Sequence, residues 1–488
     1  MDYKKGYCSV NVSISVDTLI RVRQMMWVPK IENLEGPRYL AVASAIAQAI
    51  DSGELSPGAQ LPPQRDLADH LGVTVGTITR AYSLVRKQNL VTGEVGRGTF
   101  VRDENKVRGP RIEFRPDERD QRIIDLSCYR APARGLSDLV ADAISDLSER
   151  AALLPLHKYP PAAGLPAQRA VAADWIARTG LEVSGDRVLL CGGAQQAILV
   201  ALSGLAAFSD TVLTDAVTFP GFKAIANLRG IKVRGVAMDD EGMNTAALEE
   251  AVERTGARVV YLQSTLHNPC LTLMSDARRK DIAALAVAKN LMIIEDDATA
   301  AALSDRPVPI AAYAPDNTCY VTGLAKCFSP AVRIGYLVCP RAWVDLFSNL
   351  IHVMTLGNSP ILGELASLLI TSGAAEQVRR RMNEETAQRS AEARALFAGH
   401  ALTTHPASVH MWLKLPAPWR ALDFEATARR NNVAVVASDH FVADDEVRIP
   451  PAVRVSLNAG AGEAALGRGL NTLAGLLDSR PTMMATIV

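Results

Sequence analysis

A lysine stands in a segment of the chain that carries almost no charge. In NTCYVTGLAKCFSPAVR, residues 317–333, Lys326 is the only charged residue before the closing Arg333. Its apolar neighbours favour burial, and because a buried ammonium is costly, such a lysine usually has a lowered pKa or a special role. The alternative is a lysine on a loop at a strand end, with its ammonium extended into water.

A second group of residues is suited to binding a phosphate. Gly193, Ala194 and Gln195 lie between an apolar strand and an uncharged helix. The free backbone N–H groups and the dipole at a helix start attract phosphate, although glycine turns before helices also occur where nothing binds. Arg333 follows Lys326 by seven residues, and its guanidinium is a good phosphate ligand.

An aspartate completes the pattern. Asp296 ends the apolar strand MIIED, at the place where open α/β sheets bind ligands; a simple polar strand end is the alternative for Asp296 and Asp297. A phosphate seat, a strand-end aspartate and a part-buried lysine together suggest pyridoxal 5′-phosphate. Lys326 would hold the aldehyde as a Schiff base, and Asp296 would keep the pyridine nitrogen protonated, which makes the ring an electron sink.

Length and composition limit what surrounds this site. A chain of 488 residues is too long for one ordinary core, so two or more domains are expected. Its 52 basic and 52 acidic residues leave no net charge, which excludes a global polycation and makes any basic patch local. The seven cysteines form no C-x-x-C pair and the eight histidines no H-E-x-x-H motif, so we expect a reduced, cytoplasmic protein without a metal.

Neither a signal peptide nor a membrane span is expected. The first twenty residues alternate polar and apolar side chains without a hydrophobic segment. Residues 188–209 carry no charge, but GGAQQ interrupts them, so they predict a strand, a glycine turn and a buried helix.

The chain divides into five segments. Residues 1–35 form an N-terminal arm that we expect to be disordered, and residues 36–102 show a compact helical pattern closed by a glycine-rich hairpin. Residues 103–122 are dense in charge and read as a solvated linker. In residues 123–479, apolar strands alternate with helices, which favours an α/β domain with a mostly parallel sheet. Residues 480–488 are a tail.

The helical segment has the spacing of a helix-turn-helix. Two short helices flank Gly72, and the second presents small hydroxyl side chains and Arg80 on its polar face, where they could approach base edges or phosphates. The alternative is a three-helix packing module with a solvated face, because seven basic against five acidic residues in 36–102 is weak electrostatic support. The candidate DNA contacts are Arg65, Thr74, Gly76, Thr77, Thr79 and Arg80, with Arg97 and Gly98 at the hairpin tip.

These motifs, in this order, resemble a known fusion. Residues 36–102 resemble a GntR-type winged helix-turn-helix, with Val75 where that family often has arginine, and residues 123–479 resemble a fold-type I aminotransferase. The whole chain is similar to the MocR/GabR-type regulators, which implies a multidomain protein with a winged helix-turn-helix in front of an α/β aminotransferase-like domain that binds pyridoxal 5′-phosphate and forms a homodimer.

The resemblance also implies individual roles. Lys326 would be the Schiff-base lysine, Arg454 in VRVSL the clamp for an amino acid carboxylate, and Tyr159 a residue that reaches the phosphate in the neighbouring subunit. The implied cofactor contacts are Gly193, Ala194, Gln195 and Arg333 at the phosphate, Phe219 flat on the ring, Asn268 at the ring hydroxyl and Asp296 at the ring nitrogen. Ala298 stands where a tyrosine normally steadies that hydroxyl, and Ala325 replaces a small hydroxyl residue; these departures argue against efficient transamination.

Three functional hypotheses follow. The first is a transcription regulator that binds a double-stranded DNA operator and senses an amino compound, which replaces Lys326 on the cofactor as an external aldimine. The second is a working aminotransferase with an accessory winged helix. The third is a regulator whose rear domain is only a dimerisation scaffold, and the presence of Lys326, Asp296, Arg333 and Asn268 argues against it.

Overall fold

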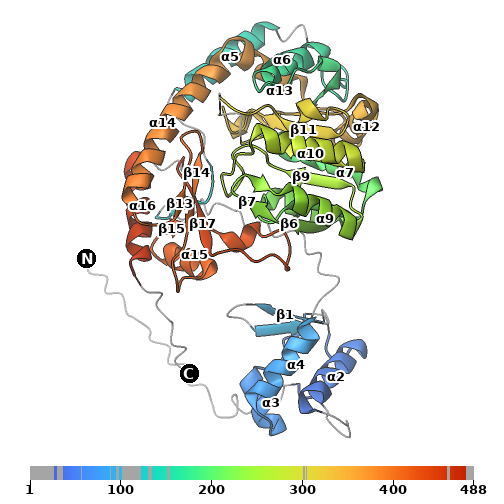
Figure 1. The fold of residues 1–488 in the computed structure, drawn as a ribbon, viewed down its shortest axis with the longest axis vertical. Helices are drawn as coiled ribbons and strands as arrows, with labels where there is room; N and C mark the ends of the chain where they lie inside the picture. The colour runs from blue at the N-terminus through green and yellow to red at the C-terminus, as the bar shows by residue number, and fades with distance from the viewer. Residues whose placement is uncertain are drawn as a thin grey trace, which may run out of the picture. The chain divides into compact units, whose positions relative to one another are not determined.

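Two compact units make up the chain. Contacts within the computed structural model group the residues into a front unit, Met1–Gly109, and a rear unit, Pro110–Val488 (Figure 1). The structure describes residues 27–29, 37–56, 58–87, 90–94, 98–101, 122–129, 135–150, 154–299, 303, 305–458 and 462–479. The predicted arm, linker and tail therefore lie almost entirely outside the described residues.

The front unit is a three-helix module with a hairpin. Its elements are α2 (Arg38–Asp51), α3 (Gln64–Leu71), α4 (Val75–Lys87), β1 (Val91–Glu94) and β2 (Gly98–Val101). The strands are antiparallel, with Val91 opposite Val101, as the glycine-rich hairpin predicted. Between α3 and α4 the chain turns at Gly72, whose positive φ of 60° suits a residue without a side chain.

Apolar side chains from every element of the front unit meet in one core. Ile78 and Val85 of α4 are fully buried, and the buried phenol of Tyr82 donates a hydrogen bond to the Pro62 carbonyl at 2.7 Å. Trp27 and Val28 pack against the same core, and the Trp27 indole N–H lies 3.2 Å from a carboxylate oxygen of Glu54. These contacts place part of the 1–35 arm on the helical core, in place of the disorder expected for the arm as a whole.

A seven-stranded sheet is the centre of the rear unit. Its strand order is β4 (Val188–Cys191), β12 (Gly335–Val338), β11 (Thr318–Gly323), β10 (Met292–Asp296), β9 (Val259–Leu262), β5 (Thr211–Asp215) and β6 (Lys232–Val236). All neighbours are parallel except β12, which is antiparallel to both β11 and β4, so the predicted mostly parallel sheet is confirmed. Most of these strands are buried on both faces, which explains their continuous apolar sequences.

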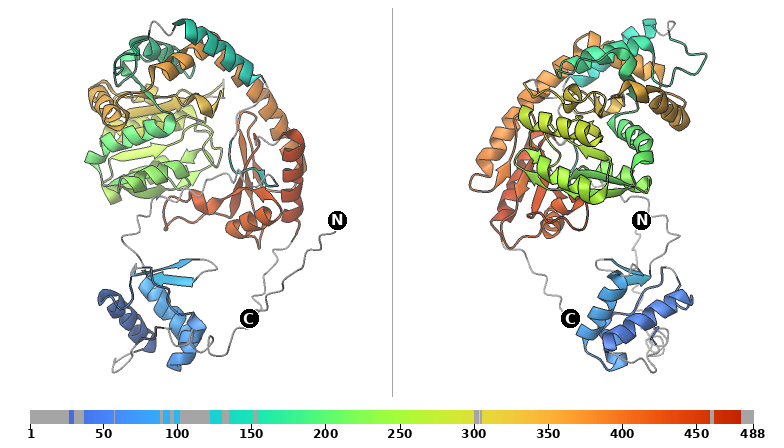
Figure 2. Two further views of the ribbon diagram at one scale, coloured as in Figure 1. Left: turned by 180° about the vertical axis from the view of Figure 1, so that it is seen from behind. Right: turned by 45° about the vertical axis from the view of Figure 1, so that its right-hand side comes forward.

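Helices cover this sheet (Figure 2). The residues 188–209 that lack charge form β4, a glycine turn and the buried helix α7, as predicted. In the described part of the chain no single helix is long and apolar enough to span a membrane, and one pair of segments bent by 119°, Arg341–Thr355 with Pro360–Thr371, passes the test of length and composition only when combined. Apart from the four-residue α11 (Ile310–Tyr313), the described α-helices of the rear unit that precede α14 are α5 (Leu136–Arg150), α6 (Pro166–Ala177), α7 (Ala194–Leu205), α8 (Pro220–Leu228), α9 (Thr245–Thr255), α10 (Asp276–Lys289), α12 (Val344–Thr355) and α13 (Pro360–Thr371).

A second, smaller sheet lies beside the first. It is antiparallel, in the order β13 (Leu402–Thr403), β14 (His410–Lys414), β17 (Ala452–Ser456) and β16 (Val436–Ala437). The 23-residue helix α14 (Ala374–Leu396), orange in Figure 1, runs from the neighbourhood of α13 to that of α16 (Glu463–Leu477) beside this smaller sheet. Near the smaller sheet lie α15 (Ala421–Arg430), the short strand β15 (Val433–Ala434) and the strand β3 (Ile124–Asp125), which pairs with β15 in parallel.

Candidate functional site

Asp296 is held by three hydrogen-bond donors at the carboxyl end of β10. The Tyr261 phenol donates to Oδ2 at 2.6 Å, the Gln263 amide donates to the same oxygen at 3.1 Å, and the Ala298 N–H donates to Oδ1 at 3.1 Å. Burial raises the pKa of Asp296, while the bond from Tyr261 opposes that change. A buried carboxylate oriented in this way is suited to pair with a cationic group of a ligand.

Lys326 follows β11, the strand beside β10, and its ammonium interacts electrostatically with Arg454, Cys128 and Asp296. Burial, reinforced by the nearby positive charge of Arg454, lowers the pKa of Lys326 to about 8, although Cys128 and Asp296 act in the opposite direction. Since an ordinary lysine has a pKa of about 10.4, far more of this amine is unprotonated, and therefore nucleophilic, at neutral pH.

Arg454 and Asn268 meet across the boundary between the two sheets. Arg454 projects from β17, and its Nη1 donates to Asn268 Oδ1 at 2.9 Å while its Nη2 donates to the Ser127 carbonyl at 2.7 Å. The Asn268 N–H donates to Gln263 Oε1 at 3.1 Å, so the amide of Gln263 links Asn268 to Asp296. The structure thus brings together the predicted ring-nitrogen, ring-hydroxyl and carboxylate ligands.

The start of α7 has the geometry of a phosphate seat. Gly193 precedes the helix with a φ of 94° and offers no side chain to cap it. The N–H groups of Ala194 and Gln195, in the first turn, lack the intrahelical partners that later residues have. Arg333 lies beside this turn and donates to the Gly192 carbonyl at 3.1 Å. A Cβ atom at Gly335 would overlap the backbone of Gly193, so the glycine in β12 allows the close approach that brings the arginine here.

Phe219 lies against the same turn. It precedes α8, and a Cβ atom added at Gly221 would overlap the Phe219 ring and approach Gln195 Oε1 at 2.8 Å. Gln195 Nε2 donates to the Gly221 carbonyl at 3.1 Å, which ties α7 to α8. The predicted aromatic residue is thus next to the predicted phosphate seat.

One predicted cofactor residue does not join the others within this chain. Tyr159 is 73% exposed. Its role at the phosphate of a neighbouring subunit therefore stays a prediction.

Sequence reasoning missed the residues that support Asp296 and Lys326. Tyr261 and Gln263 were visible only as the polar end of the strand segment RVVYLQ, and their partner depends on the register of β9 with β10. Tyr129, which contacts Lys326, stands 197 residues earlier in the chain, and no local signal marked it.

The candidate DNA contacts lie mostly on exposed faces of the front unit. Arg65, Gly76 and Arg80 are exposed on α3 and α4. The threonines also make local bonds: the Thr77 N–H donates to Thr74 Oγ1 at 3.3 Å, and Thr79 Oγ1 donates to Gln64 Oε1 at 2.7 Å. Gly98 is exposed at the start of β2, and Arg97 lies outside the described residues.

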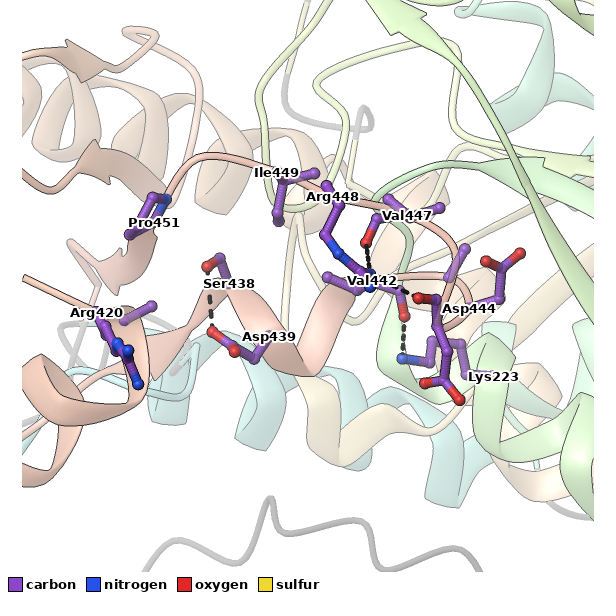
Figure 3. A pocket seen from close by; sticks show the side chains of 13 residues that line it. Lys223, Arg420, Ser438, Asp439, Val442, Asp444, Val447, Arg448, Ile449 and Pro451 are labelled. Atoms are coloured by element: carbon purple, nitrogen blue, oxygen red, sulfur yellow. Dashed lines mark hydrogen bonds between the residues drawn. The ribbon is translucent and has the colours of Figure 1, made fainter. Parts of the chain in front are cut away.

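A separate hollow of about 740 Å³ opens on the rear unit, between α8 and the segment that precedes β17 (Figure 3). The Lys223 ammonium donates to the Val442 and His440 carbonyls there, and Asp444 accepts from the Gly235 N–H at 2.8 Å. None of the predicted site residues that the structure describes lines this hollow.

Comparisons with known proteins identify the families of both parts of the chain. Residues 122–473 match the family Aminotransferase class I and II, and residues 38–101 match the gntR family of bacterial regulatory proteins. The chain belongs to the aminotransferase class I and II family. Its fusion to a GntR head is the arrangement of MocR/GabR-type proteins.

Two transcription regulators and one solved aminotransferase structure are among the proteins to which the chain is similar. The uncharacterized HTH-type transcriptional regulator YdeF of Bacillus subtilis is 30% identical over 455 residues, which cover 93% of this chain and 97% of YdeF. The pyridoxine biosynthesis regulator PdxR of Corynebacterium glutamicum is 22% identical over 69% of this chain and 74% of its own. The crystal structure of Pyrococcus horikoshii kynurenine aminotransferase has a TM-score of 0.66 at 22% identity, covering 74% of this chain and 92% of that one, which shows the fold-type I architecture.

The donor set fits pyridoxal 5′-phosphate, the cofactor that the fold implies. Asp296 supplies an anion for a ring nitrogen, Lys326 a nucleophilic amine, and the start of α7 with Arg333 a seat for a phosphate. Within the described residues, no group of three or more histidine, cysteine, aspartate or glutamate side chains is placed to hold a metal ion.

Proposed function

We propose that this protein is a transcription regulator that binds double-stranded DNA through residues 38–101 and senses an amino compound through pyridoxal 5′-phosphate in the rear unit. The proposal rests on one observation: the rear unit holds Lys326, Asp296, Asn268 and Arg454 in one site, and the segment before it in the chain matches the GntR family. The regulator names of relatives such as YdeF and PdxR support it. Because its partner is DNA, the protein would act in the cytoplasm.

The cofactor would supply an electrophilic carbon for an amine. Lys326 would hold that carbon as a Schiff base, while Asp296 would pair with the ring nitrogen and Asn268 would orient the ring hydroxyl. Gly193, Ala194, Gln195 and Arg333 would hold the phosphate, with Phe219 against the ring.

Arg454 would recognise the anionic group of the effector. Its guanidinium now donates to the Asn268 side chain and the Ser127 carbonyl, and a carboxylate could compete for those donors. The effector amine would replace Lys326 on the cofactor as an external aldimine. That exchange can change DNA binding only to the extent that the effector binds one state of the protein more tightly than the other.

Two assays test this function against an active aminotransferase. Wild-type protein should shift DNA from upstream of its own gene in a gel, and amines that change the visible absorption of the cofactor should alter that shift. Half-transamination by the same amines should be slow, because Ala298 offers no phenol near the ring hydroxyl. Fast turnover of amino acid and keto acid without a shifted band would overturn the regulator in favour of the enzyme.

We further propose a homodimer formed through an exposed apolar surface on the rear unit. This surface consists of Val353, Met354, Leu356 and Ile361 from α12, α13 and the turn between them, and Val353 is 82% exposed. Exposed apolar residues gathered in this way mark interaction surfaces. A dimer formed here would let Tyr159, also exposed, contribute to the phosphate seat of its neighbour.

Replacing Val353 with glutamate should convert the dimer to a monomer at micromolar concentration, because a charge would be buried in an apolar interface. Sedimentation velocity of the cofactor-loaded protein measures this. Val287→Glu is the matched control, since Val287 is an exposed valine on α10. If V353E dimerises as tightly as wild type, the interface lies elsewhere.

A further inference from the structure

Tyr129 lies directly against the lysine of the proposed cofactor site. Lys326 Nζ is 4.5 Å from the centroid of the Tyr129 ring, within the range of about 6 Å over which an ammonium is attracted to an aromatic face. The contact joins the segment after β3 to the loop after β11, so it depends on the tertiary fold.

Two contacts of the Tyr129 phenolic oxygen fix the ring in this position. The Tyr129 phenol donates to the Lys326 carbonyl at 3.3 Å and lies 3.3 Å from the thioether sulfur of Met382, which is fully buried on α14. The Tyr129 phenol is thus bonded to the Lys326 backbone, while the face of the same ring contacts the Lys326 side chain.

The ring acts as an aromatic face and not as a base. Burial raises the pKa of the Tyr129 phenol, so the side chain stays neutral at physiological pH. Its attraction for Lys326 is therefore that of a ring quadrupole for a cation, and Arg454 on another side of the site repels the same ammonium.

We propose that the face of the Tyr129 ring holds the Lys326 ammonium whenever an amine ligand has replaced the lysine on the cofactor. The inference rests on the proposed function and adds to it a positioning residue. In the exchange, the C=N bond of the protonated Lys326 Schiff base breaks as a C=N bond to the ligand nitrogen forms; the ligand ammonium gives up two protons and Lys326 takes up two, so Lys326 is released as an ammonium. Because the ring stabilises the released ammonium, it favours the ligand-bound state over the lysine-bound state.

Two forms of the cofactor allow the lysine-bound state to be compared with a state in which the lysine is free, even though the effector is not identified. Pyridoxal 5′-phosphate can bond to Lys326, whereas pyridoxamine 5′-phosphate has no aldehyde and leaves the lysine free. The experiment measures the dissociation constants of both for full-length protein stripped of cofactor. In Tyr129→Leu the released lysine loses its site, so the affinity for the aldehyde form should rise relative to the amine form.

The expected change in the ratio of the two dissociation constants is about two- to thirtyfold, which corresponds to a cation–π attraction of about 0.5–2 kcal/mol. Tyr129→Phe keeps the ring and should leave the ratio within about twofold of wild type. A general packing defect would weaken both cofactors alike and leave the ratio unchanged. If Y129L fails to fold by circular dichroism, Tyr129→Met is the second ring-free variant and carries the same expectation.

The outcomes distinguish this inference from the function on which it rests. An unchanged ratio in the folded ring-free variant overturns the role of Tyr129 and leaves the cofactor proposal intact. An equal shift in Y129F and Y129L also overturns it, because the phenolic O–H and not the ring face would then hold the lysine. If wild-type protein binds neither form of the cofactor, the proposed function fails and the inference fails with it.

Discussion

Replacing Arg306 with alanine should lower the free energy of unfolding of the rear unit by about 3–5 kcal/mol. Arg306 Nη1 lies 2.6 Å from Asp297 Oδ2, and the two side chains are only 3% and 1% exposed. The Tyr320 phenol also donates to Asp297. Without the guanidinium, the buried carboxylate would lose its direct ion-pair partner, and that cost is the source of the expected loss.

An exposed ion pair in the same unit is the control. Lys280 Nζ lies 2.7 Å from Asp276 Oδ2 on α10, but the side chains are 57% and 47% exposed. Water screens such a pair, so Lys280→Ala should destabilise the protein far less than Arg306→Ala. Urea denaturation of both variants, followed by circular dichroism, measures the difference. Equal losses would mean that burial does not set the strength of the Arg306 pair.

The buried pair also matters for the proposed cofactor site. Asp297 follows Asp296 directly, and its negative charge raises the pKa of Asp296. Arg306 offsets that charge. Burial is the larger cause of the raised pKa of Asp296, and the ion pair limits what the charge of Asp297 adds to it.

Much of the candidate site was predictable because its residues stand at strand ends. In a parallel sheet the carboxyl ends of the strands meet at one edge, so Asp296 at the end of β10 and Lys326 after β11 had to lie close together. The glycine turn before α7 was readable for a similar reason, since β4 runs in the same direction as β11. Arg454 and Asn268 were placed by resemblance, and the structure joins them by a hydrogen bond.

The remaining contacts depend on information that no local pattern contains. Tyr261 reaches Asp296 only because β9 and β10 pair in a register that sets Leu262 opposite Glu295. Tyr129 reaches Lys326 from a segment far away in sequence. Both residues are aromatic and could equally have filled the core, so their types gave no sign of their partners.

In the front unit the sequence predicted the faces of the helices better than the bonds on them. The periodicity of α4 separated buried residues such as Ile78 from exposed ones such as Arg80. It did not predict that Thr79 bonds to Gln64 on α3. A threonine hydroxyl can hydrogen-bond either to DNA or to a neighbouring group of the protein, and only the tertiary arrangement decides which partner is within reach.

Replacing Lys326 with alanine should abolish the covalent cofactor adduct completely, since no other residue is proposed to form the Schiff base. Wild-type protein loaded with pyridoxal 5′-phosphate should be yellow, and borohydride should fix the cofactor to the chain, with mass spectrometry placing the label on Lys326. The variant should show neither property. A colourless wild-type protein after loading would contradict the cofactor proposal, and a labelled K326A would assign the Schiff base to another lysine.

The same variant and its counterpart in the front unit should separate cofactor binding from DNA binding. K326A should keep its affinity for DNA within about tenfold of wild type, because a coupling at the lower end of the typical range of about 1–3 kcal/mol changes an affinity by about tenfold or less. Arg80→Ala should weaken DNA binding by about 1–3 kcal/mol if the exposed guanidinium contacts a base, and should leave the cofactor spectrum unchanged. If Arg80 contacts a phosphate instead, binding should weaken for all sequences, with a shallower dependence on salt concentration. Fluorescence anisotropy on labelled DNA at several salt concentrations measures both variants, and a cofactor spectrum altered by R80A would show that the two functions do not separate.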